Sequence, residues 1–182
     1  MKKPLLILLF SISFFMAVPA EVSITNLDIS SEKGHILFSF DVADPFQGKN
    51  LDKLKSGLEV SFIFQVEVRR IRKLLPDARL LKKTFSVNSR FRPQDNSYTF
   101  TLLEDKMILA IQHGLTLEEL QEKMTSPGNL SISTEGKLQH QEELILAVRA
   151  VIDTHYILSI IPSRTKTPWR EKRFIFRQKQ IQ

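Results

Sequence analysis

Arginine and lysine are the charged residues that this sequence gathers most densely. Arg69, Arg70 and Arg72 end one apolar-alternating segment, and Arg90 and Arg92 end the next one. Arginine suits bidentate contact with phosphate or carboxylate because its guanidinium is planar and always charged. If the two segments pair as a hairpin, we expect the five arginines to converge on one rim and form an anion-facing patch. The alternative is a solvated face that protects the sheet from edge-to-edge pairing. The basic clusters also contain Lys73, Lys82 and Lys83.

The histidines do not have the spacing of a metal site or a catalytic pair. The four are His35, His113, His140 and His155, and they fall in separate segments. A zinc motif such as HExxH places two ligands on one side of a helix, and only His140 with Glu143 approaches that arrangement. The chain has no cysteine, no G-x-S-x-G elbow and no glycine-rich phosphate loop. We therefore predict no catalytic residues, no metal site and no cofactor.

The segment from Leu54 to Leu75 determines the fold class. From residue 60 its apolar residues alternate with polar ones, which is the period of a β-strand and not of a helix. The glutamates and arginines in the same run are too frequent for a membrane span. One apolar face and one charged face indicate an antiparallel sheet that is wetted on one side, with Ile63 as the exception on the polar face. The apolar face consists of Val60, Phe62, Phe64, Val66 and Val68.

The remaining segments predict more strands and two short helices. EVSITNLDIS and HILFSFDVAD read as a hairpin, and RLLKKTFSVNSRF reads as the strand that returns beside residues 60–70. Asn50 as N-cap and Gly57 as stop indicate one helix, with Leu51, Leu54 and Leu58 at helical spacing. Thr116 and Glu119 have the spacing of a capping box and indicate the second helix. Residues 142–161 fit both templates, and we favour strands because β-branched and aromatic residues dominate the second half. The expected fold is mainly β: an antiparallel β-sandwich, Ig-like or related, with two short helices.

The first 20 residues predict a secretory signal peptide. Two lysines precede an apolar run over residues 5–18, and small residues flank Pro19 up to Ala20. We expect cleavage after Ala20, so that the mature chain starts at Glu21 and is soluble in the periplasm or another exported location. The alternative is an uncleaved anchor. The apolar run is shorter than the roughly 20 residues that a span prefers.

The mature chain has the size of one domain and a modest charge. Removing the leader from 182 residues leaves 162, and the loss of two lysines reduces the net charge from +6 to +4. We expect residues 21–182 to form a single β-sandwich domain with a full core. Nucleic acid is a poor candidate partner, given this charge and compartment. No transmembrane span is expected after cleavage, and the sequence carries no signal of oligomeric state.

Several segments together resemble a known family. They are the helix that ends at Gly57, the strand LEVSFIFQVEVRR, the basic strand pair, AVRAVID, and Trp169 followed by RFIF. The pattern resembles a family of uncharacterised exported bacterial proteins catalogued as a domain of unknown function (DUF4390-like). The resemblance covers nearly all of the mature chain. It implies an exported bacterial domain and no particular activity.

Two functional hypotheses remain. The favoured one is a non-enzymatic binding or scaffold module of the cell envelope, whose basic rim contacts an envelope protein or an anionic envelope component such as lipid headgroups. The alternative is a periplasmic hydrolase or metal enzyme whose site is assembled only in three dimensions. A cleft that holds His140 or His155 beside a carboxylate would favour the enzyme.

Overall fold

The computed structural model of the chain describes residues 22–46, 49–134, 136, 138–157 and 161–177, without the side chains of residues 49, 153–157 and 161–165. The predicted signal peptide, residues 1–20, lies outside this part. The strands are β1 (Ser23–Glu32), β2 (His35–Ala43), β3 (Val60–Arg70), β4 (Ala78–Arg92), β5 (Ser97–Glu104), β6 (Met107–Leu115), β7 (Leu130–Ser133), β8 (Glu142–Ile157), β9 (Ile161–Lys166) and β10 (Arg170–Phe176). The helices are α1 (Lys49–Lys55) and α2 (Leu117–Thr125). Among the described residues, no helix is long and apolar enough to cross a membrane.

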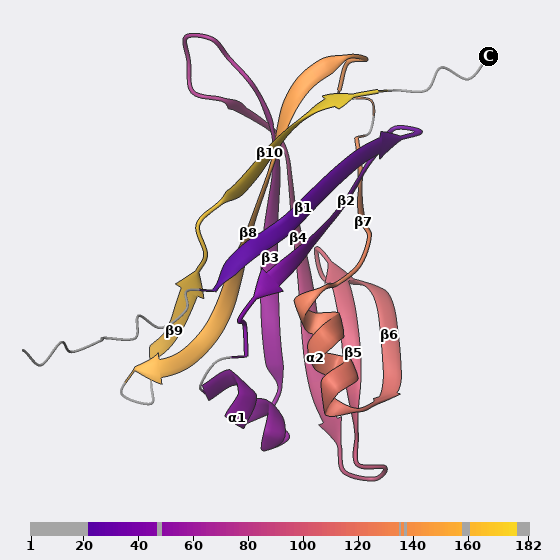
Figure 1. Cartoon of the computed structure of the whole chain (residues 1–182), viewed down its shortest axis with the longest axis vertical. Helices are drawn as coiled ribbons and strands as arrows, with labels where there is room; N and C mark the ends of the chain where they lie inside the picture. Colours follow the sequence, from indigo (N-terminus) through magenta and orange to yellow (C-terminus); the bar gives the residue numbers. More distant parts are fainter. Residues whose placement is uncertain (1–21, 47–48, 135, 137, 158–160, 178–182) are drawn as a thin grey trace, which may run out of the picture.

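The strands form two antiparallel sheets that pack face to face (Figure 1). The smaller sheet has the order β1-β2-β7, and the larger has the order β10-β8-β3-β4-β5-β6, with β9 also paired to β8. The hairpin predicted across SSEKG is confirmed, because β1 and β2 pair from Ser23 with Ala43 to Glu32 with His35. The predicted mainly β sandwich with two short helices is therefore confirmed.

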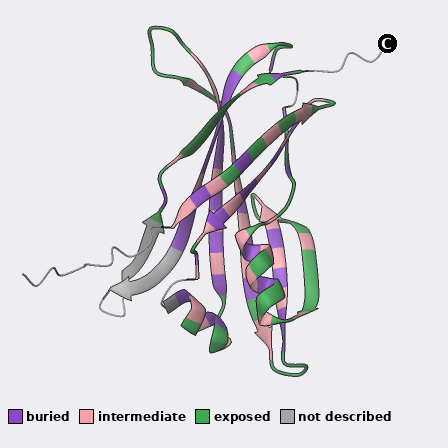
Figure 2. Cartoon of the chain, in the orientation of Figure 1, coloured by how far each residue is buried: buried purple, intermediate pink, exposed green. Residues whose placement is uncertain are grey.

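Aromatic side chains join the two sheets. Phe40 of β2 meets Phe64 of β3 with ring centroids 4.9 Å apart, and Phe38 meets Phe85 of β4 at 5.8 Å. All four rings are buried, and the apolar side chains predicted for the inner face of β3 are buried with them. In Figure 2 the buried residues are purple, and they lie mainly where the two sheets face each other. Edge-to-face contacts of this kind add to the stability that burial supplies. The period-two prediction for this strand is confirmed.

The two helices close parts of the core that the smaller sheet leaves open. In α2, Leu120 and Met124 are buried, and the predicted capping box is present: Glu119 N–H donates to Thr116 Oγ1 and Thr116 N–H donates to Glu119 Oε2. Near α1, Gly57 has a φ of +75°, which suits the predicted stop.

Two predictions for α1 are wrong in detail. Asn50 lies inside the first turn and does not cap the helix, because its amide Nδ2 donates to the Pro45 carbonyl. Leu58 is 58% exposed, since Gly57 turns the chain away before this residue can continue the buried stripe of Leu54.

The ambiguous run at residues 142–161 is a strand where it is described. β8 spans Glu142–Ile157, and residues 158–160 lie outside the described part. Its middle pairs with β3 on one side, while β10 and β9 pair with successive parts of its other side. Successive side chains from Leu144 to Val148 are buried, so both faces of the strand are covered there and β8 reads as an apolar run without alternation.

β6 is the edge strand beyond β5 and exposes apolar side chains. Met107, Ile108, Leu109 and Ile111 are all exposed. The pairing of β6 with β5 shifts register twice, and each shift leaves an extra residue on β6. Such bulges hinder an edge strand from pairing with another chain.

Candidate functional site

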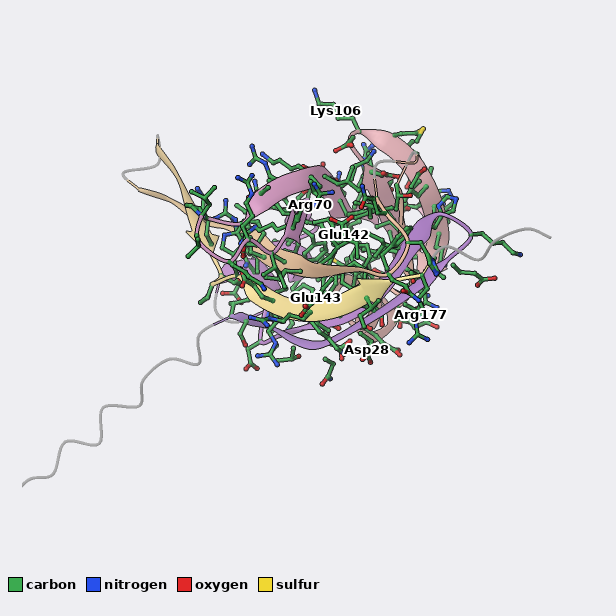
Figure 3. All side chains as sticks on the ribbon, turned by 90° about the horizontal axis from the view of Figure 1, so that it is seen from above. Asp28, Arg70, Lys106, Glu142, Glu143 and Arg177 are labelled. Atoms are coloured by element: carbon green, nitrogen blue, oxygen red, sulfur yellow. The ribbon has the colours of Figure 1, made fainter. Side chains whose placement is uncertain are left out.

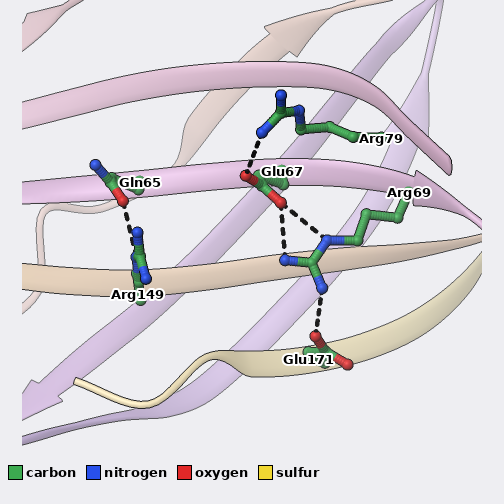
Figure 4. A network of polar contacts seen from close by, with 6 residues as sticks. All are labelled: Gln65, Glu67, Arg69, Arg79, Arg149 and Glu171. Carbon is green, nitrogen blue, oxygen red and sulfur yellow. Dashed lines mark hydrogen bonds and ion pairs between the residues drawn. The ribbon is translucent and has the colours of Figure 1, made fainter. Parts of the chain in front are cut away.

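The outer face of the larger sheet, turned away from the smaller sheet, holds a buried carboxylate at Glu67. This residue was expected to face water, but it is only 8% exposed. Arg69 Nη2 lies 2.8 Å from Glu67 Oε2, and Arg79 Nη1 of the neighbouring strand lies 3.2 Å from Oε1 (Figure 4). Burial alone would raise the pKa of Glu67, but hydrogen bonds from the two arginines lower it below its ordinary value. The carboxylate therefore stays ionised and orders the two arginines.

Trp169 completes this network from the other end of the chain. The guanidinium of Arg69 lies 4.9 Å from the centroid of the Trp169 ring, and that of Arg149 lies at 4.4 Å. Arg69 Nη1 also lies 2.7 Å from Glu171 Oε1, and Arg149 Nε donates to Gln65 Oε1 at 2.8 Å. Arg69 is thus held by two carboxylates and one aromatic ring. These contacts give Arg69 a structural role in holding β3 to β10, and Arg149 of β8 contacts the same tryptophan ring.

Arg70 is also paired within the protein. Its Nε donates to Glu142 Oε1 at the start of β8, and both residues are labelled in Figure 3. Gln139 N–H donates to the other carboxylate oxygen. The hydrogen bond from Arg70 lowers the pKa of Glu142 below its ordinary value, with burial opposing it.

The expected convergence of the five arginines on one rim is wrong. β3 and β4 are antiparallel, so Arg70 pairs with Ala78 at the start of β4, while Ser89 pairs with Val60 at the start of β3. Arg90 lies 12 residues beyond Ala78, which is roughly 40 Å at about 3.3 Å per residue. The C-terminal ends of consecutive antiparallel strands lie at opposite ends of the pair, and this direction alone separates the two groups.

At the far end of β4, the two remaining arginines have different surroundings. Arg92 Nη2 lies 3.6 Å from Asp95 Oδ2. Arg90 is exposed and forms no ion pair with a described residue. A hydrogen bond from Ser97, together with Arg92, lowers the pKa of Asp95.

The end where β3 turns into β4 carries cations that the fold does not neutralise. Arg72, Lys73 and Lys82 are exposed, and none forms an ion pair with a residue in the described ranges. Arg79 shares Glu67 with Arg69 and keeps a side chain that is 58% exposed. We call these four residues the basic hairpin end: Arg72, Lys73, Arg79 and Lys82.

Only Arg72 of the basic hairpin end belongs to the predicted arginine set. Lys73 and Lys82 belong to the same sequence clusters, but the predicted contact set included only arginines. Glu142 and Glu171, which pair with Arg70 and Arg69, lie far along the chain, so no local pattern could reveal them. Glu67, two residues before Arg69 on the same face of β3, is the partner that the sequence could have revealed. The sequence did offer one signal: the two strands of a hairpin run antiparallel, which places Arg90 and Arg92 at the opposite end from Arg69, Arg70 and Arg72.

His35 and His113 each lie beside a hydroxyl group. His35 Nδ1 lies 3.2 Å from Ser131 Oγ across β2 and β7, but no described acidic side chain contacts His35. His113 Nδ1 lies 3.0 Å from Thr99 Oγ1. His140 precedes a strand, so it does not share a helix face with Glu143, and the side chain of His155 is not described.

No metal site is present in the part of the chain that the structure describes. It holds no group of three or more His, Cys, Asp or Glu side chains that could bind a metal ion. Among the surface hollows of the described residues, those along β1 with β2, β1 with β10, and β8 with β10 are not lined by histidine.

The fold and this site define a two-sheet antiparallel β-sandwich with a charged network on its outer face and a basic hairpin at one end. The chain belongs to the family described as Domain of unknown function (DUF4390), whose family model matches residues 20–157. The predicted family is therefore confirmed. The match includes the basic hairpin end and stops before Trp169. Searches of curated proteins and of solved structures find no match.

Proposed function

We propose that the protein is an exported, non-enzymatic binding module of the cell envelope, and that its basic hairpin end contacts an anionic partner. The observation that carries the proposal is the unequal pairing of charges at this end. Glu67, Glu142 and Glu171 are each engaged by an arginine, whereas Arg72, Lys73 and Lys82 have no ion-pair partner among the described residues. The leader-like residues 1–20 support export to a compartment where anionic lipids and polymers are the abundant polyanions.

The ion pairs also indicate which arginines to leave out of the contact surface. Arg69 and Arg70 would have to leave buried or half-buried partners to bind a ligand, at a cost in stability. Arg72, Lys73 and Lys82 can bind an anion without breaking an ion pair among the described residues. An anion-binding surface at one end leaves the remaining faces of the sandwich for a scaffold role.

A charge-reversal pair with a matched control tests the proposal. One variant carries Arg72→Glu and Lys82→Glu at the basic hairpin end, and the control carries Arg90→Glu and Arg92→Glu at the far end of the same strand. Each is measured for the fraction of protein that cosediments with isolated cell envelopes. The circular dichroism of each variant confirms its fold.

We expect the parent to bind envelopes and the control to bind as well as the parent, while the near-end variant loses binding. Binding should also weaken with added salt, because the Debye length falls from about 10 Å at 0.1 M to about 3 Å at 1 M. If the near-end variant folds and still binds like the parent, this end is only a solvated face and the proposal fails.

A further inference from the structure

The tip of the β3–β4 hairpin exposes two adjacent leucines. Leu74 is 96% exposed and Leu75 is 62% exposed. The loop between β3 and β4 extends away from the neighbouring strands at the top of the molecule in Figure 1. Pro76 and Asp77 follow, and Asp77 Oδ1 accepts the backbone N–H of Arg72 at 3.3 Å, which fixes the base of the loop. The two leucines therefore form a convex apolar tip on an ordered support.

Cations surround this tip on both strands. Of the 15 residues from 69 to 83, seven are Arg or Lys and one is acidic. The ion pairs with Glu67, Glu142 and Glu104 engage Arg69, Arg70 and Lys83. Arg79 also pairs with Glu67, but its side chain stays 58% exposed. Arg72 and Lys73 directly precede the leucines and have no ion-pair partner among the described residues. Lys82 lies further back on β4, opposite Glu67. The single acidic residue, Asp77, already accepts the Arg72 amide.

An apolar tip followed by cations matches the layers of an anionic lipid bilayer. Leucine side chains are favoured at the boundary between headgroups and acyl chains, and arginine and lysine extend from there to lipid phosphates. Each cation near an anionic surface adds to the attraction. A convex tip needs no complementary pocket in a fluid bilayer, whereas a protein partner would have to supply one.

The other exposed apolar group, on β6, does not have these properties. Its ladder is interrupted by two register shifts, and its residues Met107 to Leu115 include no lysine or arginine. The β3–β4 loop places two adjacent exposed leucines directly after Arg72 and Lys73, which have no ion-pair partner among the described residues.

We propose that the β3–β4 loop docks the protein on an anionic lipid bilayer, with Leu74 and Leu75 inserted and the basic hairpin end against lipid phosphates. This inference rests on the proposed function and names the partner of the same surface. In this docked position the long axis of β3 and β4 stands upright on the plane of the bilayer. The sandwich then stands off the membrane, and the far end of β4 points away from it.

The absence of cysteine makes an environment-sensitive dye a direct test of insertion. The dye is attached to the full chain at Leu75→Cys, and in a control to Leu58→Cys, an exposed leucine near the far end. The probes are vesicles of equal parts phosphatidylglycerol and phosphatidylcholine, and vesicles of phosphatidylcholine alone. We expect a blue shift at position 75 with the anionic vesicles only, and none at position 58.

Vesicle cosedimentation separates the leucines from the charges. We expect the Leu74→Ser, Leu75→Ser variant to bind anionic vesicles about tenfold or more weakly than the parent, and the Arg72→Glu, Lys82→Glu variant to lose binding. Any leader residues that remain are identical in all variants, so the difference reports the loop. The two leucines are exposed, so their replacement leaves the core intact.

Two outcomes would overturn the inference. If the parent does not bind anionic vesicles at low salt, the partner is not a bilayer, and the envelope cosedimentation above decides separately whether the basic end binds anything. If charge reversal abolishes vesicle binding but the serine variant binds like the parent without a dye shift at position 75, the basic end binds anions electrostatically. In that case the proposed function stands and the insertion is wrong.

Discussion

Glu67 shows how a sheet face holds a charge with little access to water. Its two carboxylate oxygens accept from Arg69 and Arg79, and each arginine is also exposed enough to keep some hydration. An ionised carboxylate that lost both partners would remain buried without compensation, which is costly. Hydrogen bonds to charged groups contribute about 1.5–3 kcal/mol each. The residue therefore contributes to stability through its neighbours on β3 and β4.

The contribution of Glu67 and Glu142 is expected to be lost in acid. At Glu67 burial raises the pKa, but the hydrogen bonds from Arg69 and Arg79 lower it by more. At Glu142 the hydrogen bond from Arg70 lowers the pKa and outweighs the effect of burial. Both pKa values therefore lie below the ordinary value of 4.5. As pH falls below 4.5, the unfolded chain takes up protons before the folded chain, so the free energy of unfolding decreases until the folded pKa is passed. Urea melts between neutral pH and about pH 3 measure this loss.

The matched variants for this acid dependence are Glu67→Gln with Glu142→Gln, and Glu143→Gln as the control. The double variant should have a lower free energy of unfolding at neutral pH and a shallower decline toward acid. Glu143 has a side chain that is 59% exposed and a distant partner at 3.8 Å, so its replacement should change little. An unchanged decline in the double variant would show that other carboxyls cause the acid sensitivity.

The aromatic residues of β3 should dominate its contribution to stability. Phe62→Ala or Phe64→Ala removes a fully buried ring and leaves a cavity, which costs about 3–5 kcal/mol. Gln65→Ala on the outer face loses one hydrogen bond from Arg149, a loss of about 0.5–1.5 kcal/mol. Urea melts of the three variants rank these costs. A larger loss for Gln65 than for the phenylalanines would place the core on the other face of β3.

At the scale of elements, local patterns predicted the strands well and their mutual placement poorly. Period-two alternation predicts β3, and the capping box predicts α2, because both signals lie within a few residues. The position of β8 between two strands, and the pairing of Arg69 with Glu171, depend on contacts across more than 70 residues. Alternation fixes which face a side chain occupies. It does not fix which distant strand lies beside it.

The basic hairpin end illustrates the same limit. The clusters of arginine and lysine were visible in the sequence, but ion-pair partners on β3, β5, β8 and β10 decide which cations remain unpaired. The charge of a cluster is a local property. Its availability to a partner depends on the fold.

The turn after α1 offers a test of how the helix is joined to β3. Gly57 has a φ of +75°, and a Cβ at this position would lie 3.0 Å from Phe91 Cδ1. Gly57→Ala therefore combines backbone strain with a clash against a ring that packs on Tyr98. Gly128→Ala is the matched control, since Gly128 has a φ of +84° and nothing within 4 Å of its Cβ position.

We expect both glycine variants to lose about 1 kcal/mol through the left-handed backbone, with a further loss at Gly57 from the displaced Phe91 ring. Thermal or urea unfolding compares the two directly. Equal losses would mean that Phe91 moves aside without cost and that backbone strain alone acts at Gly57.

At the scale of the whole molecule, the two ends of the larger sheet have different characters. One end presents the leucine tip and the basic hairpin end, and the other presents α1 and the β4–β5 turn, where Arg92 lies beside Asp95. A net charge of +6 for the whole chain does not by itself predict such a division. The division arises because strand pairing distributes the acidic partners unevenly.

The location of the protein can be measured without knowledge of its partner. Expressed with its first 20 residues in a bacterium with two membranes, the protein should be recovered from the periplasmic compartment. Its measured mass should correspond to a chain that starts at Glu21, because Val18 and Ala20 form a small-residue cleavage site. A full-length species extracted only with detergent would support an uncleaved anchor.

Trp169 gives this protein a built-in optical reporter. It is the single tryptophan of the chain, so the tryptophan fluorescence of the protein comes from one place on the outer sheet face. Two guanidinium groups lie within 5 Å of its ring, and one of them belongs to the arginine that Glu67 orders. Protonation of Glu67 should therefore change the emission before the phenylalanine core opens. The same spectrum would distinguish local loosening of the outer face from global unfolding.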